Sequence, residues 1–463
     1  MNTAFQDAFP NILTLFEERK YGVHSIMVQQ HGKLLGECFW TPHEPEDAHM
    51  LNSLSKSFTS IGVLFAMQEG LLDADDYLTE IFPGYDCCEN MKKMRVRHLL
   101  TMSTGHKPNA DFIFGYEDCV SAFMTSDVPH EPGSFFLYNT AATYMLSAIV
   151  MKLTGQPVYE YLRPRFFEPL GIDGIYWESC ARGIPYGGFG LYVHTGDILK
   201  LGQFLLNGGS WEGRQLLSPS LIAHATSRQI DNTGNGAKDW SAGYGWQFWR
   251  CSPDGVYRGD GAFGQYCIVL PHQDAVIATT AAARDMHVLI ELIWEELLPS
   301  LEQDADVKEP LILRRPLPTA KGEASGIPGV CGVRYQLEKN PLGLTGFTVK
   351  ENGEVIFTTS NTQIPVYAVR AANRGWSFNE TGWRENPLMP GGAGLLNRFS
   401  ASCGWTGSTL HLTLVGRNSA FTQTAAIEFA GPGRPAVMRI SQDIGMKEMQ
   451  IRANILKREW QKD

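Results

Sequence analysis

The sequence has no long apolar run and no stretch dense in lysine and arginine. No uninterrupted apolar run approaches the roughly 20 residues that a membrane-spanning helix needs. Residues 1–20 also lack the basic and then apolar pattern of a signal peptide. The formal net charge is −10, and no segment could follow a phosphate backbone. We therefore expect a cytoplasmic chain that binds neither a membrane nor a nucleic acid.

Paired cysteines are missing as well. The nine cysteines form an odd, scattered set, without CxxC pairs and without the histidine spacing of a zinc site. We therefore expect free thiols in a reducing compartment, and neither a metal nor an organic cofactor. The cysteines stand at positions 38, 87, 88, 119, 180, 251, 267, 331 and 403.

The chain is too long for one ordinary domain. Its 463 residues, 43% hydrophobic and 19% charged, have the composition of a globular protein. Residues 302–328 are charged and rich in proline and glycine, which is typical of a linker. Beyond them, short β-type runs alternate with turns, including Asn352-Gly353. We expect two domains, residues 1–315 and 316–463, the second a small antiparallel β domain.

The first domain shows both strand and helix patterns. Residues 21–40 alternate as two strands around His31-Gly32-Lys33, and residues 54–69 read as a buried helix before Gly70. Helical patterns dominate residues 95–210. Together they predict an α/β (α+β) fold in which helices flank an antiparallel sheet beside a helical lobe. Further strands are expected at 244–250, 266–271 and 275–282, and a long helix at 286–301.

Ser53 and Lys56 stand at the start of the predicted buried helix. Residues three apart face the same side of a helix, and a nearby amine of lowered pKa can activate a serine hydroxyl. An isolated Ser-x-x-Lys is a weak signal. Here, however, Lys56 is the only charged residue before Glu69 in a nearly apolar helix, where an unpartnered ammonium would be costly. Ser53 is therefore a candidate nucleophile, with Lys56 as its activating amine.

These residues and five further stretches in the same order resemble the serine β-lactamase and penicillin-binding-protein superfamily. The resemblance covers about residues 10–300 and favours the class C-like branch, which includes esterases and D-amino-acid peptidases. It implies a β-lactamase-like fold and an acyl-enzyme on Ser53. The stretches are SLSKSFTS, EGLLDADDYLTEIFP, VRHLLTMSTGH, EPGSFFLYNTAATYMLSAIVMKLTG, GDILKLGQFLLNGGSWEGRQLLSP and YRGDGAFGQYCIVLP.

The resemblance also implies a second and a third motif. Tyr138 takes the family's tyrosine position, as general base or proton relay. Thr140 stands where the family has asparagine, and Asn139 comes one place early. The third motif of the family is a lysine or histidine, then any residue, then a glycine. It aligns with Gly259-Asp260-Gly261, so the cationic residue of the motif is absent here. Gly261 would let the strand approach closely, and the N–H groups of Ala262 and Ser53 would form the oxyanion hole.

The function expected is hydrolysis of an ester or amide, such as a D-amino-acid peptide, through a Ser53 acyl-enzyme. The partner is then a small molecule or a peptide. A class C β-lactamase is an alternative that the missing cation disfavours, because that cation holds the antibiotic's carboxylate. A catalytically silent ligand-binding or scaffold homologue is the other alternative, motivated by Thr140 and Gly259. Capping or packing roles are expected for His98 and His106, and Trp211, Trp246 and Trp249 are given no catalytic role.

Overall fold

The computed structural model divides the chain into two compact units. The first unit comprises Met1–Phe39 and Ala48–Arg314, and the second comprises Trp40–Asp47 and Arg315–Asp463. The structure describes residues 4–108, 110–302, 308–362, 365–380, 398–443 and 448–455. The expected division at 315/316 lies one residue after the observed boundary, and the short segment Trp40–Asp47 belongs to the second unit rather than the first.

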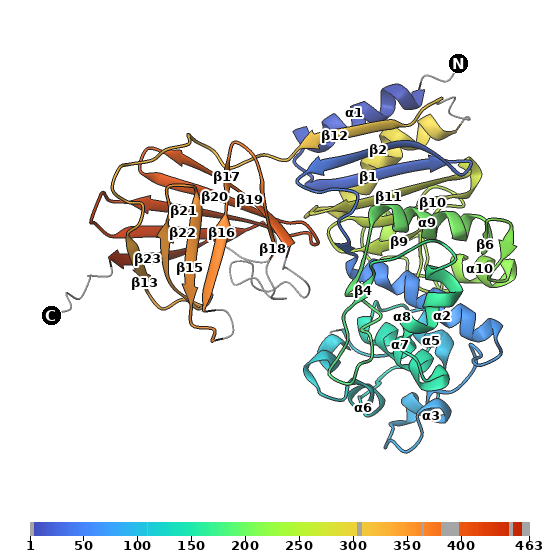
Figure 1. Cartoon of the computed structure of the whole chain (residues 1–463). Coiled ribbons are helices and arrows are strands. Elements are labelled where there is room, and N and C mark those ends of the chain that lie inside the picture. The colour runs from blue at the N-terminus through green and yellow to red at the C-terminus, as the bar shows by residue number, and fades with distance from the viewer. Residues whose placement is uncertain are drawn as a thin grey trace. The chain divides into compact units, whose positions relative to one another are not determined.

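The first unit is built on a seven-stranded sheet (Figure 1). The predicted hairpin is present as β1 and β2, and β1 pairs antiparallel with β11, which joins early and late parts of the chain. The order across the sheet is β12-β2-β1-β11-β10-β9-β8. The strands are β1 (Val23–Gln30), β2 (Lys33–Thr41), β8 (Trp249–Arg250), β9 (Tyr257–Gly261), β10 (Gln265–Leu270), β11 (Ala275–Ala281) and β12 (Leu311–Pro316).

Helices cover both faces of this sheet. On β10, Cys267 Sγ contacts the carbonyl of Ile198 in α9 (Thr195–Leu206), whereas the neighbouring Tyr266 donates its hydroxyl hydrogen bond to the carbonyl of Met286 in α11 (Met286–Leu292). Because successive strand residues point to opposite faces, α9 and α11 lie on opposite sides. Helix α1 (Ala4–Glu18) packs against η6 (Ile293–Leu297), which continues α11. The predicted sandwich of helices around an antiparallel sheet is confirmed.

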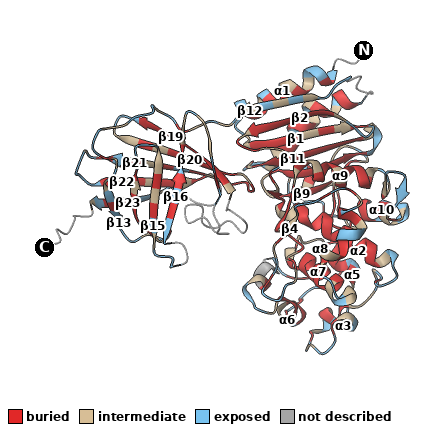
Figure 2. Cartoon of the chain, viewed as in Figure 1, coloured by how far each residue is buried: buried red, intermediate tan, exposed pale blue. Residues whose placement is uncertain are grey.

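The helical lobe surrounds one central buried helix, α2 (Ser55–Gln68). Twelve of its fourteen residues are buried, and it packs against α7 and α8, in a region where burial is dense (Figure 2). The remaining lobe helices are α3 (Leu78–Ile81), α4 (Glu89–Lys92), α5 (Val96–Leu100), α6 (Cys119–Met124), α7 (Thr140–Thr154) and α8 (Val158–Leu162), and α10 (Pro219–Thr226) follows α9 in the chain.

Short elements connect the longer ones. The short helical turns are η1 (Asn52–Leu54), η2 (Ala110–Gly115), η3 (Arg163–Phe167), η4 (Lys238–Trp240), η5 (Pro271–Gln273) and η7 (Leu298–Leu301). The short strands are β3 (His49–Met50), β4 (Tyr176–Trp177), β5 (Leu191–Val193), β6 (Ser210–Trp211) and β7 (Arg214–Gln215).

Three expected elements differ from the structure. The helix expected over 286–301 is regular only in α11, after which η6 is a π-helical turn and η7 a 3₁₀ turn. The strand expected over 244–250 is reduced to β8. Within the expected linker, β12 forms the edge of the sheet beside β2, because its alternating half-buried side chains can pair there.

The second unit is a mainly antiparallel β structure with its own core, and its short strand β17 pairs parallel with β19. Asn352-Gly353 lies in the turn between β14 and β15, as expected, with Gly353 at φ 81°. The side chain of Asn379 on β18 bonds both the N–H and the carbonyl of Arg370 on β16, at 2.9 Å each. The strands are β13 (Arg334–Leu337), β14 (Leu344–Val349), β15 (Glu354–Thr359), β16 (Val366–Arg370), β17 (Ala372–Asn373), β18 (Ser377–Glu380), β19 (Arg398–Thr406), β20 (Thr409–Gly416), β21 (Thr422–Phe429), β22 (Ala436–Gln442) and β23 (Met449–Ile455).

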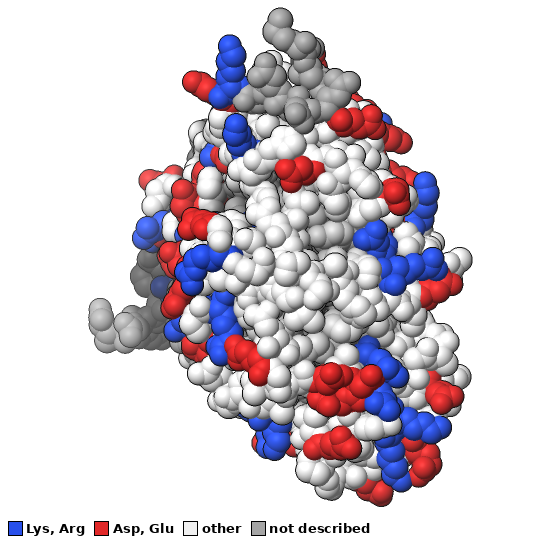
Figure 3. All heavy atoms as spheres, turned by 90° about the vertical axis from the view of Figure 1, so that its right-hand side faces the viewer, with Lys and Arg blue, Asp and Glu red and all other residues white. Residues whose placement is uncertain are grey.

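Charge is mixed on the face of the molecule drawn in Figure 3. Basic and acidic side chains lie next to one another there, and no extended basic patch appears on that face. Among the described helices, none combines the length and the apolar character needed to cross a bilayer.

Candidate active site

Ser53 lies in η1, the short helical turn that leads directly into α2. The preceding residue, Asn52, has a left-handed backbone with φ 49°, a conformation that asparagine tolerates better than most residues. Its side-chain amide donates a hydrogen bond to the carbonyl of Ala262, at 3.0 Å. The turn that carries Ser53 is thereby tied to the end of strand β9.

Lys56 is buried in the first turn of α2, with 1% of its surface exposed. Its Nζ lies 3.0 Å from Ser53 Oγ, 2.8 Å from the carbonyl of Gly188 and 3.4 Å from Thr140 Oγ1. A lysine ammonium has three N–H donors, so these three acceptors can satisfy it. The amine that the sequence singled out is therefore partnered rather than solvated, and one partner is the candidate nucleophile.

Tyr138 stands just before α7 and faces Lys56 with its ring. Lys56 Nζ lies 4.9 Å from the ring centroid, within the range of a cation–π contact. The ring stacks on Trp249, with centroids 5.4 Å apart at 23°, and meets Tyr244 edge-on at 6.4 Å. The structure thus brings Ser53, Lys56 and Tyr138 together, with Tyr138 held by two further aromatic rings.

The two residues after Tyr138 have different surroundings. Asn139 is 2% exposed and caps α7: its Oδ1 accepts the N–H of Ala142, and its Nδ2 donates to Thr104. Both ends of its side chain are occupied within the lobe, so Asn139 is a helix cap rather than a substrate contact. Thr140 does reach the site, since its hydroxyl faces Lys56.

At the third motif, strand β9 packs directly against the turn that carries Ser53. A Cβ atom on Gly261 would lie 2.0 Å from the carbonyl oxygen of Leu51, and one on Gly259 would lie 2.3 Å from the Leu54 side chain. A side chain at Gly261 would require the backbone to move, and one at Gly259 would require the side chains of Leu54 and Ser57 to shift. The approach places Ala262 beside η1, where its carbonyl accepts from Asn52. The oxyanion hole from the N–H groups of Ser53 and Ala262 stays a prediction.

Asp260, the middle residue of this motif, pairs with Arg258. Arg258 is fully buried, and its Nε and Nη2 lie 3.0 and 2.8 Å from Asp260 Oδ2. Its Nη1 donates to the carbonyl of Asp239, and its guanidinium lies 4.4 Å from the Trp240 ring centroid. Burial raises the pKa of Asp260, while the charges of Arg258 and Lys56 oppose that rise.

Arg258 had no place in the sequence prediction. The signal that could have found it is the spacing Arg258-x-Asp260, because residues two apart on a strand share one face. The aromatic support of Tyr138 by Trp249 and Tyr244 was missed too, and no local pattern indicates it.

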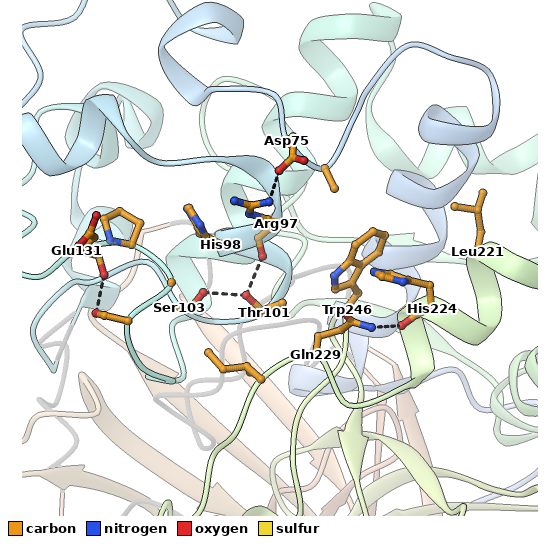
Figure 4. A pocket seen from close by; sticks show the side chains of 15 residues that line it. Asp75, Arg97, His98, Thr101, Ser103, Glu131, Leu221, His224, Gln229 and Trp246 are labelled. Atoms are coloured by element: carbon orange, nitrogen blue, oxygen red, sulfur yellow. Dashed lines mark hydrogen bonds and ion pairs between the residues drawn. The ribbon is translucent and has the colours of Figure 1, made fainter.

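One cavity of the first unit lies away from these residues. It has a volume of about 860 Å³, and neither Ser53, Lys56 nor Tyr138 lines it (Figure 4). His98 contributes to its wall, and its ring accepts the backbone N–H of Arg95. Burial, with smaller effects of Arg97 and Arg95, lowers the pKa of His98 to about 4. His98 therefore has the capping role that the sequence suggested.

No group of three or more His, Cys, Asp or Glu side chains in the described ranges could hold a metal ion. What the site offers chemically is a hydroxyl and a phenol on either side of one buried amine. That set suits proton transfer and nucleophilic attack on a carbonyl carbon.

Several solved structures share this fold. The octameric penicillin-binding protein homologue from Pyrococcus abyssi covers 97% of this chain and 99% of its own, with a TM-score of 0.52 and 16% identity. EstCE1, described as a hydrolase with promiscuous acyltransferase activity, covers 65% of this chain and 99% of its own, with a TM-score of 0.54 and 15% identity. At these identities the likeness concerns the fold alone.

Curated relatives match over parts of their sequences. Penicillin-binding protein 4 of Amycolatopsis lactamdurans is 24% identical over 309 residues, which are 57% of this chain and 79% of that protein. A beta-lactamase of Yersinia enterocolitica is 23% identical over 236 residues, 46% of this chain and 59% of that protein. The chain spans only 56% of the Escherichia coli (strain K12) relative provisionally described as a D-alanyl-D-alanine carboxypeptidase, at 22% identity over 41% of this chain. The sequence profile of the Beta-lactamase family matches residues 14–293, more than half of the chain, and the chain therefore belongs to the beta-lactamase family.

Proposed function

We propose that this chain is a serine hydrolase that cleaves an ester or an amide through an acyl-enzyme on Ser53. The observation that carries the proposal is the 3.0 Å separation of Ser53 Oγ and Nζ of the buried Lys56. A general base has to lie within about 2.6–3.2 Å of the group whose proton it takes. Lys56 meets this condition without any rearrangement.

The reaction follows from these positions. Lys56, in its neutral form, takes the hydroxyl proton while Ser53 Oγ forms a bond to the carbonyl carbon of the substrate. The bond from that carbon to the alcohol or amine then breaks, and the leaving group receives a proton from Lys56 directly or through Tyr138. Water attacks the acyl-enzyme in the second half, which returns the proton to Ser53. The N–H groups of Ser53 and Ala262 are the proposed donors to the carbonyl oxygen.

The preferred substrates are small esters, or peptides and amides of D-amino acids, rather than β-lactams. The support for this preference is Gly259, which stands where a β-lactam-recognising site has its cation and carries no side chain. Hydrolysis of nitrocefin at rates typical of a dedicated enzyme would contradict the preference.

Replacing the nucleophile tests the proposal. Ser53→Ala should abolish hydrolysis of a p-nitrophenyl ester and covalent labelling by a fluorophosphonate probe, because it removes the hydroxyl that lies 3.0 Å from Lys56 Nζ. Ser60→Ala is the matched control: it removes a hydroxyl from the same helix, where Ser60 bonds the carbonyl of Trp246. Labelling of Ser53→Ala as strong as that of the control would refute the acyl-enzyme.

Lys56→Ala extends the test to the base. We expect a loss of about 10²–10⁴-fold in kcat/KM, measured with the same ester. A silent scaffold homologue, the alternative that Thr140 and Gly259 motivate, predicts no serine adduct on the unmodified chain by intact-protein mass spectrometry. A stoichiometric adduct on Ser53 would exclude it.

A further inference from the structure

The cavity drawn in Figure 4 is lined by residues of helices α5 and α10 in the first unit. Arg97 and His98 come from α5 and His224 comes from α10, and Trp246 lies beside His224 in the figure. The volume of about 860 Å³ falls in the range of roughly 300–1,000 Å³ that is typical of small-molecule sites. The cavity is therefore large enough for a ligand, and the chemistry of its wall decides which kind.

His98 turns an unused hydrogen-bond donor toward this cavity. The residue is 9% exposed, and its Nδ1 accepts the backbone N–H of Arg95 at 3.1 Å. Because burial lowers the pKa of the ring to about 4, the ring is neutral at pH 7 and carries its hydrogen on Nε2. No residue that the structure describes accepts this hydrogen, and Nε2 is not among the fully enclosed atoms without a partner. The N–H of His98 therefore opens onto the cavity that the residue lines.

Trp246 contributes a second donor of the same kind. The residue is 6% exposed, and its ring meets His224 edge-on with centroids 4.4 Å apart. Its backbone is fixed on both sides, since its N–H donates to Ala225 and its carbonyl accepts from Ser60. Within the described ranges its indole N–H has no acceptor, and Nε1 too is not fully enclosed. Since buried N–H groups are nearly always paired, two such donors on one cavity indicate that a ligand supplies the acceptors.

The hydroxyl groups in the wall leave an acceptor rather than a donor. Thr101 Oγ1 donates to the carbonyl of Arg97 at 2.8 Å. Ser103 Oγ, which lies 2.8 Å from Thr101 Oγ1, is therefore the donor in that contact. The remaining lone pairs of Ser103 Oγ can accept a hydrogen bond. The cavity thus offers two N–H donors and one hydroxyl acceptor.

The charged side chains at the cavity already compensate one another. Arg97 pairs with Asp75, and Glu131 lies 3.8 Å from Lys93. No lysine or arginine among the described residues of the wall is left without an acidic partner. An anion would therefore exchange its hydration for two neutral N–H groups only, which costs more than the transfer of an uncharged group. Apolar surface for the rest of a ligand comes from Ala74, Pro132, Leu221 and Ile230.

We infer that this cavity is a second ligand site of the chain, separate from Ser53, and that it binds a small uncharged amide. Carbonyl oxygens of the amide accept hydrogen bonds from Nε2 of His98 and Nε1 of Trp246. An amide N–H donates to Ser103 Oγ, and the apolar part of the ligand packs against the apolar wall. The inference goes beyond the proposed acyl-enzyme and does not depend on it.

N-acetyl-L-leucinamide, which has two carbonyl groups, an apolar side chain and no charge, is the probe. The full chain labelled with ¹⁵N in its indoles should give a signal for each of its 11 tryptophans, and Trp246→Phe identifies that of Trp246. We expect this signal to shift saturably, with a Kd of about 1 mM or below. N-acetyl-L-leucine, which has a carboxylate in place of the primary amide, should bind at least about tenfold more weakly.

His98→Asn tests the other donor. The introduced amide oxygen can still accept the N–H of Arg95, but the N–H at the position of Nε2 is lost. The affinity for N-acetyl-L-leucinamide, read from the Trp246 signal, should fall about fivefold. His272→Asn is the matched control, because His272 is exposed and does not line the cavity. The control should bind the amide as tightly as the unmodified chain.

Each outcome decides for or against the second site. Absence of a saturable shift of the Trp246 signal would overturn the inference, because water alone then satisfies the two N–H groups. Equal affinity for N-acetyl-L-leucine would overturn it too, as would a folded His98→Asn variant with unchanged affinity. If His98→Asn fails to fold, the comparison of amide and acid on the unmodified chain decides.

Ser53→Ala separates this site from the proposed active site. The variant should bind N-acetyl-L-leucinamide as the unmodified chain does, with the same shift of the Trp246 signal. Loss of the shift in Ser53→Ala would assign the amide to the Ser53 site and overturn the inference. None of these results bears on the acyl-enzyme, which is tested by the adduct on Ser53.

Discussion

At the scale of single residues, a buried histidine anchors the segment that carries Tyr138. Asn139 Nδ2 donates to Thr104 Oγ1, which lies 2.9 Å from His106 Nδ1. His106 Nε2 lies 2.8 Å from Ser126 Oγ, whose own hydrogen goes to the carbonyl of Phe123. These partners suit a neutral ring with hydrogen on Nε2, which donates to Ser126 and accepts from Thr104. His106 thus packs and orders the lobe, as the sequence suggested, and takes no part in the reaction.

This network predicts loss of stability in acid. Burial lowers the pKa of His106 from 6.5 to about 4, so between these values the unfolded chain binds a proton that the native chain does not. The free energy of unfolding should therefore fall as the pH falls from about 6.5 to about 4, by about 3 kcal/mol for this group. Urea unfolding at several pH values measures the slope.

The variant His106→Gln should give a flatter pH profile, although it lowers stability at neutral pH. The matched control is His130→Gln, at an exposed position, which should keep the slope of the unmodified chain. Equal slopes in His106→Gln and the unmodified chain would contradict the assignment.

At the scale of elements, the contact between β9 and η1 determines where Ser53 lies. Gly261→Ala should lower the free energy of unfolding by roughly 2 kcal/mol or more, because the new methyl group would fall 2.0 Å from the Leu51 carbonyl and backbone must move. Turnover of the p-nitrophenyl ester should fall with it. Thermal unfolding and ester hydrolysis measure the two effects.

The control for this strand variant is Gly196→Ala in helix α9. No atom lies within 4 Å of a Cβ added at Gly196, so this variant should be neutral or slightly stabilising. Similar destabilisation by both substitutions would show that the approach of β9 to η1 is not the reason for Gly261.

The sequence predicted those elements and site residues whose pattern lies within one short segment of the chain. The hairpin of β1 and β2 and the helix α2 were predictable, because alternation and an apolar run identify them within one segment. The change from α11 to a π-helical turn at Ile293 was not, since a single π-helical turn within a helix is too short to leave a periodic pattern of its own. Ser53 and Lys56 lie one helical turn apart and could be paired from sequence. Asn139, by contrast, is turned away from the site by its bonds to Thr104 and Ala142, which no spacing rule reveals.

At the scale of the whole molecule, the second unit includes a segment from the early part of the chain. Asp47, the last residue of Trp40–Asp47, is 5% exposed, and its Oδ2 lies 2.8 Å from Arg417 Nε. Arg398 lies 3.8 Å from the other carboxylate oxygen. Burial raises the pKa of Asp47, and Arg417 opposes that rise. The ion pair of Asp47 with Arg417 therefore joins the segment Trp40–Asp47 to the later strands of the second unit through a buried carboxylate.

Removal of the principal partner should weaken the second unit. Arg417→Ala leaves Asp47 buried with only the more distant Arg398, and we expect a loss of about 3 kcal/mol, measured by thermal unfolding of the full chain. Arg439→Ala is the matched control, because it breaks an exposed pair with Glu428 that contributes at most about 1 kcal/mol. Equal losses in the two variants would contradict a structural role for the Asp47 pair.

The placement of Trp40–Asp47 has a practical consequence for protein engineering. A fragment that begins near residue 315 does not contain the whole β unit, because the segment Trp40–Asp47, which precedes Ser53 in the sequence, also belongs to that unit. Chimaeras with other hydrolases would need two splice points, one at each end of this early segment, besides the later junction. A swap made only at the later junction would transplant a β unit that lacks one of its own pieces.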